Sequence, residues 1–127
     1  MKKILLILGA LILVIGIGAG IFVKLSQDEL NALVKTPITD VDLSSIADGT
    51  YTGSYSAFPV KVTVEVQVSN HTITDIVITH HDNGQGKAAE GIVDDVIEAQ
   101  SLDVDVISGA TYSSKVILLA IVDALTP

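Results

Sequence analysis

An uninterrupted apolar run near the N-terminus constrains this chain most. The stretch from Ile4 to Val23, "ILLILGALILVIGIGAGIFV", contains no charged side chain. About 20 residues form a helix of roughly 30 Å, which matches the hydrocarbon thickness of a bilayer. A cleaved signal peptide has a shorter apolar region of about 7 to 15 residues and a small-residue cleavage site, to which "GAGIFVKLS" is a poor match. The run therefore predicts an uncleaved transmembrane anchor over residues 1–25.

Charged residues on either side of the run predict its orientation. Lys2 and Lys3 precede it, whereas Lys24 follows it and is itself followed by Asp28 and Glu29. Positive charge is enriched on the cytoplasmic side of membrane spans. We therefore expect a single-pass protein of the cell membrane, with a cytoplasmic N-terminus and an extracytoplasmic domain.

Composition narrows the chemistry of the rest of the chain. From Gly49 onward it has ten acidic residues against three lysines, a net charge of −7, and the whole chain has no arginine. Nucleic acid is an unsuitable partner for such a surface, because phosphate binding uses clustered basic residues. The absence of cysteine excludes disulfides, thiolate-bound iron–sulfur clusters and haem attached through cysteine.

Residues 26–48 are polar with scattered apolar positions and predict a juxtamembrane linker. Ser26 followed by Glu29 fits a capping box, which indicates a helix that continues or restarts at the membrane surface. An extended segment is expected after Pro37.

Residues 49–127 have the pattern of a small α+β domain. Strands are predicted over 48–57, 60–68 and 72–81, because apolar and polar residues alternate; the alternation fails between Ile73 and Ile76, which indicates a bulge. Helices are predicted over 87–100 and 113–125, with a short fourth strand, "LDVDVIS", between them. The expected fold is a small antiparallel sheet covered by two helices, preceded by one N-terminal transmembrane helix.

The stretch "DVISGATYSS", residues 105–114, gathers four hydroxyl side chains at the predicted strand-to-helix junction. The first turn of a helix has unpaired N–H groups and the positive end of the helix dipole, so it attracts phosphate. Ser108 or Thr111 as a simple helix cap is the plainer interpretation. A cap needs only one hydroxyl, however, and here there are four.

These residues resemble a known family. "DVISGAT" fits the D-x-x-[ST]-G-A-T pattern of the FMN-binding domain family, found in the C and G type subunits of sodium-pumping NADH:quinone reductase and Rnf complexes. The resemblance extends over residues 49–127, through "DGTYTGSY", "VKVTVEVQVSNHTITDIVI" and "HHDNGQGKAAE". It implies FMN bound through a phosphoester to Thr111, attached by an FAD:protein FMN transferase outside the cytoplasmic membrane.

The resemblance also implies supporting residues around Thr111. We expect N–H or hydroxyl donors, or close approach of the backbone to the ligand, at Ser108, Gly109, Ser113 and Ser114. Lys115 is expected to balance the phosphate charge. Ala110 adds little bulk between them. Asp105 is expected to be recognised by the transferase, with a structural turn role as the alternative.

The loop "HHDNGQGKAAEG" is the second candidate segment. Gly84, Gly86 and Lys87 are expected near the flavin, with a plain strand-to-helix turn as the alternative. His80 and His81 are adjacent in a strand and so point to opposite faces, which argues against their sharing a metal ion. No metal site is predicted.

Together these features predict a membrane-anchored electron carrier that exchanges electrons with membrane redox partners, whose identity the sequence leaves open. No nucleophile and base lie close together in the sequence, so we expect a carrier or a subunit of a redox system more than a stand-alone enzyme. Two alternatives stay open: a module that binds or senses FMN non-covalently, and a structural subunit with a vestigial flavin site.

Overall fold

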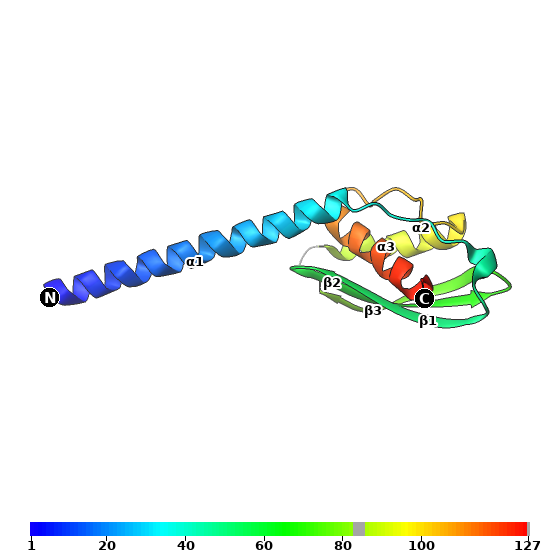
Figure 1. Cartoon of the computed structure of the whole chain (residues 1–127), viewed down its shortest axis with the longest axis horizontal. Helices are drawn as coiled ribbons and strands as arrows, with labels where there is room; N and C mark the ends of the chain where they lie inside the picture. The colour runs from blue at the N-terminus through cyan, green and yellow to red at the C-terminus, as the bar shows by residue number, and fades with distance from the viewer. Residues whose placement is uncertain (83–85, 127) are drawn as a thin grey trace.

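The chain folds into a long N-terminal helix, a three-stranded sheet and shorter helices that cover one face of that sheet (Figure 1). This computed structural model describes residues 1–82 and 86–126. Its elements are α1 (Lys2–Lys35), η1 (Leu43–Ser45), β1 (Gly49–Ala57), β2 (Val60–Ser69), β3 (Thr72–Asp82), η2 (Gly86–Gly91), α2 (Ile92–Ala99) and α3 (Thr111–Leu125). The predicted fold class is confirmed.

Helix α1 is long and apolar enough to cross a membrane. Its most apolar 18-residue window has a mean hydropathy of 2.9, and none of that window is buried inside the protein. A signal sequence near an N-terminus passes the same test of length and hydropathy. These two properties therefore establish that the helix is long and apolar, and they do not distinguish an anchor from a signal sequence. Figure 1 shows this helix projecting as a rod away from the domain.

The sheet is antiparallel, in the order β1-β2-β3. Strand β2 is its centre, and its valines alternate with polar residues, so that one face of the strand is buried. The buried valines are Val60, Val62, Val64, Val66 and Val68. The polar residues between them face away from the helices.

Two threonines of β3 form bulges, which confirms the predicted irregularity of this strand. The register shifts after Thr63 and after Gln67 of β2, leaving Thr79 and Thr74 of β3 without opposite partners. Each extra threonine donates its hydroxyl to the carbonyl oxygen of the β2 residue at the shift, at 3.2 Å in both cases. Bulges redirect the side chains that follow them, and the bulge at Thr79 immediately precedes His80 and His81.

Helix α3 is the central element of the core. Its residues from Val116 to Ile121 are all buried, because β1 and β2 cover one side and other segments of the chain cover the rest. Gly53 of β1 lets the helix lie directly on the strand: a Cβ there would overlap the carbonyl oxygen of Ala120 and the amide nitrogen of Ala124. At the strand edge, Asp123 accepts a hydrogen bond from the N–H of Ser54 at 2.9 Å.

Replacing Gly53 with alanine should therefore destabilise the domain, although alanine is ordinarily tolerated better than glycine within a strand. The methyl group would meet helix backbone, and overpacking of this kind costs about 1 to 3 kcal/mol. Urea unfolding followed by tyrosine fluorescence measures the loss, since all three tyrosines lie in the domain. Thr52→Ala, on the exposed face of the same strand, is the control; equal stability of the two variants would contradict this packing.

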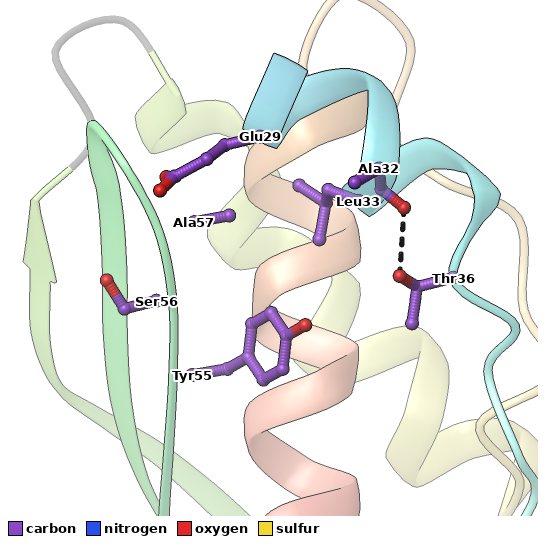
Figure 2. A pocket seen from close by; sticks show the side chains of 7 residues that line it. All are labelled: Glu29, Ala32, Leu33, Thr36, Tyr55, Ser56 and Ala57. Carbon is purple, nitrogen blue, oxygen red and sulfur yellow. Dashed lines mark hydrogen bonds between the residues drawn. The ribbon is translucent and has the colours of Figure 1, made fainter. Parts of the chain in front are cut away.

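The end of α1 is part of the domain's core. Leu33 is 2 % exposed and Ile46 is also buried, so residues 26–48 contribute to the packing. Figure 2 shows Leu33 and Glu29 of α1 facing Ala57 and Tyr55 of β1 across a cavity of about 200 Å³. The helix ends at Lys35, where the hydroxyl of Thr36 donates to the Ala32 carbonyl at 2.9 Å.

The predicted fourth strand at residues 102–108 is wrong: the part of the chain described here has three strands, and residues 103–107 have no regular structure. Asp40 holds the start of this segment instead, accepting from the Ser101 hydroxyl at 2.6 Å and from the Leu102 amide at 3.0 Å. These bonds, first that of Ser101, lower the pKa of Asp40 below its usual range. The segment thus pairs with the residues after α1 and not with a sheet edge.

The edge of β3 is closed by a side chain. Gln100, which ends α2 in a left-handed conformation, accepts from the Ile73 amide at 2.7 Å and donates to the Ile73 carbonyl at 2.8 Å. Its amide thus pairs with both backbone groups of one edge residue, as a neighbouring strand would. The predicted helix over 87–100 is divided at Gly91 into η2 and α2.

Candidate functional site

The motif "SGAT" forms a tight turn followed directly by the first turn of α3. The Ala110 amide donates to the Ile107 carbonyl at 3.0 Å, and Gly109 has a φ of +79°, which favours glycine. A Cβ on Gly109 would meet no atom of the described residues within 4 Å, so among these residues open space adjoins the backbone there. Ser108 and Thr111 are exposed on either side of it.

The interpretation of Ser108 or Thr111 as a helix cap is wrong. The N-cap residue is Ala110, and among the described residues no side-chain capping hydrogen bond is made to this helix end. Thr111 is the first residue of the helix. The first-turn N–H groups of a helix have no partner within the helix, so in the described part of the chain this end presents uncapped amides.

Ser114 holds the turn in place. Its side chain is fully buried, its hydroxyl donates to the Ala110 carbonyl at 2.7 Å, and the same oxygen accepts from the Ile107 amide at 3.0 Å. These bonds join both ends of the turn to the helix that follows. Ser114 was expected to supply an N–H or hydroxyl donor to the ligand; in this structure its amide and its hydroxyl both donate to the Ala110 carbonyl.

Ser114→Ala should therefore loosen the turn. The partly buried Ile107 N–H loses its acceptor, and an unpaired group of this kind costs about 1 to 3 kcal/mol. Urea unfolding of the full chain in detergent gives the free energy of unfolding. Ser108→Ala removes an exposed hydroxyl from the same turn and should change that free energy by less than about 0.5 kcal/mol; a similar loss in both variants would argue against the role of Ser114.

Ser113 lies beneath the same helix turn, beside a buried histidine. The side chain of His81 is 3 % exposed; its Nε2 lies 3.4 Å from Ser113 Oγ and its Nδ1 lies 3.0 Å from Glu90 Oε1. The ring thereby connects the end of β3, η2 and the start of α3. His80 points the other way and pairs with Asp82 at the surface, at 3.0 Å, as alternation along a strand predicts.

The two histidines allow a matched comparison. His81→Ala should lower the free energy of unfolding by about 1 to 3 kcal/mol, because it leaves a gap under α3 and removes the contacts to Glu90 and Ser113. His80→Ala removes only an exposed ion pair, which is worth about 0 to 1 kcal/mol. The same urea experiment compares them, and a larger effect at position 80 would show that the ring of His81 does not join these elements.

The structure brings most of the predicted site residues together around the start of α3. Ser108, Gly109 and Thr111 are exposed, whereas Ala110 and Ser113 are buried with Ser114. Asp105 is exposed on the segment leading to the turn. Lys115, one turn after Thr111 on the same helix face, places its ammonium 3.5 Å from the carbonyl oxygen of Val34 at the end of α1.

The second candidate loop, residues 80–91, is described except for residues 83–85. Gly86 and Lys87 open η2, and Gly84 lies outside the described residues. Sequence reasoning missed Glu90 and the inward position of His81. The signal available was the bulge in β3, which determines which of the two adjacent histidines faces the helices.

Among the described residues, cavities are also found away from this turn. One of about 320 Å³ is found at the opposite end of α3, where Ala124 and Leu125 meet Tyr51 and residues 45–47. Its lining is mainly apolar, and it contains no residue of the motif. The start of α3, with its exposed threonine and uncapped amides, remains the candidate site.

Comparison with protein-family models identifies the family of this domain. The model of the FMN-binding domain family matches residues 57–126, which include β2, β3, α2, α3 and the turn before Thr111. A comparison with curated proteins gives no match. Since the family model covers more than half of the chain, the protein belongs to the FMN-binding domain family.

Proposed function

We propose that this protein is a membrane-anchored flavoprotein that carries FMN on Thr111 through a phosphoester bond and transfers electrons outside the cytoplasmic membrane. One observation carries the proposal. In a chain that belongs to an FMN-binding family, an exposed threonine is the first residue of a 15-residue helix whose start has no side-chain cap from the residues that the structure describes.

The start of α3 suits a phosphate group. A phosphate on Thr111 Oγ1 would lie beside the first-turn amides and the positive end of the helix dipole, both of which favour anions. Open space next to Gly109 gives a ligand access to the backbone. The framework below, built by Ser114 and by His81 with Ser113, fixes the turn without occupying it.

Charged residues near Thr111 have opposite effects on a bound phosphate. The domain is acidic, and a phosphodiester keeps one negative charge, so nearby donors are needed to hold it. Lys115 is one helical turn from Thr111 and supplies a cation on the same face. Asp105 is exposed nearby and would repel a phosphate, which suits contact with the maturation enzyme better than contact with the cofactor.

With FAD as the donor, the attachment step exchanges one phosphorus–oxygen bond for another. The Thr111 hydroxyl oxygen forms a bond to the phosphorus on the FMN side of FAD, and the phosphoanhydride bond of FAD breaks. AMP leaves with the bonding electrons, and the hydroxyl proton passes to a base. An FAD:protein FMN transferase is the partner that supplies this chemistry.

When bound, FMN supplies reversible electron transfer; this chain's own residues hold it and keep it at the membrane. A covalent link suits an extracytoplasmic carrier, since a dissociable cofactor would be lost by dilution. Helix α1 would retain the domain near membrane redox partners, with Lys2 and Lys3 favouring a cytoplasmic N-terminus.

Thr111→Ala should abolish covalent flavin, and Thr111→Ser should retain part of it, because the serine keeps the nucleophilic oxygen. The full chain is produced with a matching transferase, then examined by in-gel flavin fluorescence after denaturation and by intact mass. Thr126→Ala, which alters an exposed threonine at the other end of the same helix, should be flavinylated normally.

The outcomes separate the alternatives. Denaturation-resistant flavin in Thr111→Ala would show that the attachment site is elsewhere. Flavin that copurifies with the unmodified chain but is lost on denaturation would favour the non-covalent binding module. An unmodified mass with no flavin would favour a structural subunit.

A further inference from the structure

The turn between β1 and β2 touches α1 at the end of its apolar run. The rings of Phe58 and Phe22 meet edge to face, with centroids 5.4 Å apart and planes at 82°. Phe22 is the next-to-last residue of the uncharged run that ends at Val23. The turn therefore reaches back along the helix to the level where the apolar segment stops.

Phe58 is poorly accommodated by the protein alone. Its side chain is 48 % exposed, while Ala57 and Val60 on either side of the turn are buried. An aromatic ring of this size loses favourable transfer free energy when half of it stays in water. Its ring partner, Phe22, belongs to the segment that would itself be surrounded by lipid.

The charges near the turn fit a bilayer surface. Lys24 follows Phe22 by two residues, Lys61 follows Phe58 by three, and both are exposed. Lysines next to an apolar surface extend their charged ends toward the headgroups while their carbon chains stay in the apolar layer. Apolar rings bordered by lysines are thus typical of the membrane–water interface.

The turn is held at this level by the rest of the domain. Helix α1 is continuous from Phe22 to Leu33, a distance of about 16 Å along the axis, and Leu33 is buried in the core. Figure 2 shows the last turns of α1, at Glu29 and Leu33, lying beside the end of β1 at Ala57. No loop separates the apolar run from the core, so the domain keeps one orientation relative to the helix.

We propose that the β1–β2 turn is a second membrane contact, in which Phe58 inserts into the surface of the same bilayer that α1 crosses. The inference rests on the proposed membrane-spanning role of α1. A second protein chain is a weaker candidate for this surface, because Phe58 meets a residue of the apolar run itself and lysines border the contact.

The contact would turn the FMN end of the domain toward the membrane. Lys61, next to the turn, lies opposite Asp82 in the register of β2 and β3. Asp82 is the last residue of β3, so β3 ends beside the turn. The preceding residue, His81, contacts Ser113 in the first turn of α3. In Figure 1 the start of α3 accordingly lies at the end of the domain from which α1 leaves, and the helix runs away from that end toward the C-terminus.

Single nitroxide labels test the contact, since the chain contains no cysteine of its own. Phe58→Cys, Phe22→Cys and Val77→Cys are labelled in the full flavinylated chain, reconstituted into phospholipid vesicles. Oxygen concentrates in the bilayer and a nickel chelate stays in water, so power saturation with each reports the surroundings. We expect an oxygen-to-nickel accessibility ratio several-fold higher at positions 58 and 22 than at exposed Val77 of β3.

Each outcome is decisive. A lipid-type ratio at 22 with a water-type ratio at 58 would leave the anchor standing and overturn the membrane contact. A label at 58 shielded from both reagents would show a protein partner and also overturn it. Water-type ratios at both positions would contradict the anchor itself, and the inference with it. Phe58→Trp in the flavin-free chain, with brominated lipids as quenchers, checks the result using a conservative side chain in a protein without tryptophan.

Discussion

The close packing of α3 against β1 at Gly53 is the constraint on which the rest of the structure depends. Because no side chain separates helix and strand there, the helix lies directly on the sheet and its middle is buried on every side. A helix held this firmly can leave its first turn uncapped at the surface without unravelling. The exposed end of a buried helix is what makes Thr111 both accessible and fixed.

The hydroxyl cluster around the motif divides into two groups with different physical roles. Ser113 and Ser114 are buried: Ser114 completes the hydrogen bonds of the turn, and Ser113 lies against His81. Ser108 and Thr111 are exposed on either side of Gly109. A surplus of hydroxyls at one helix start thus reflects a turn that needs internal hydrogen bonds as well as a site that faces solvent.

Sequence periodicity predicted what depends on local pattern. The alternating valines of β2, the bulge in β3 and the apolar run of α1 were identified because each follows from the local order of apolar and polar residues. The fourth strand failed, since "LDVDVIS" alternates well enough for a strand but Asp40 holds the start of the segment beside the residues after α1. The Gln100 amide meanwhile occupies the β3 edge at Ile73, and such long-range pairing has no local signature.

The same limit applies to the candidate site. The family resemblance and helix physics predict Thr111 as the attachment residue, but neither revealed that Glu90 and His81 support the helix from below, since these residues approach Ser113 only through the fold. Nor did pattern alone separate Ser114 from its exposed neighbours, because a buried serine and an exposed one look alike in sequence.

The residues matched by the family model, 57–126, do not include the whole core of the domain. Residues 57–126 alone would form a domain small enough to bury a modest share of its surface. Strand β1, which pairs along its length with β2, lies almost wholly before that range, and so do Leu33 of α1 and Ile46. Part of the core is therefore supplied by the segment that leads out of the apolar helix. Because that segment contributes to the fold, it holds the helix and the domain in one arrangement instead of acting as a flexible tether.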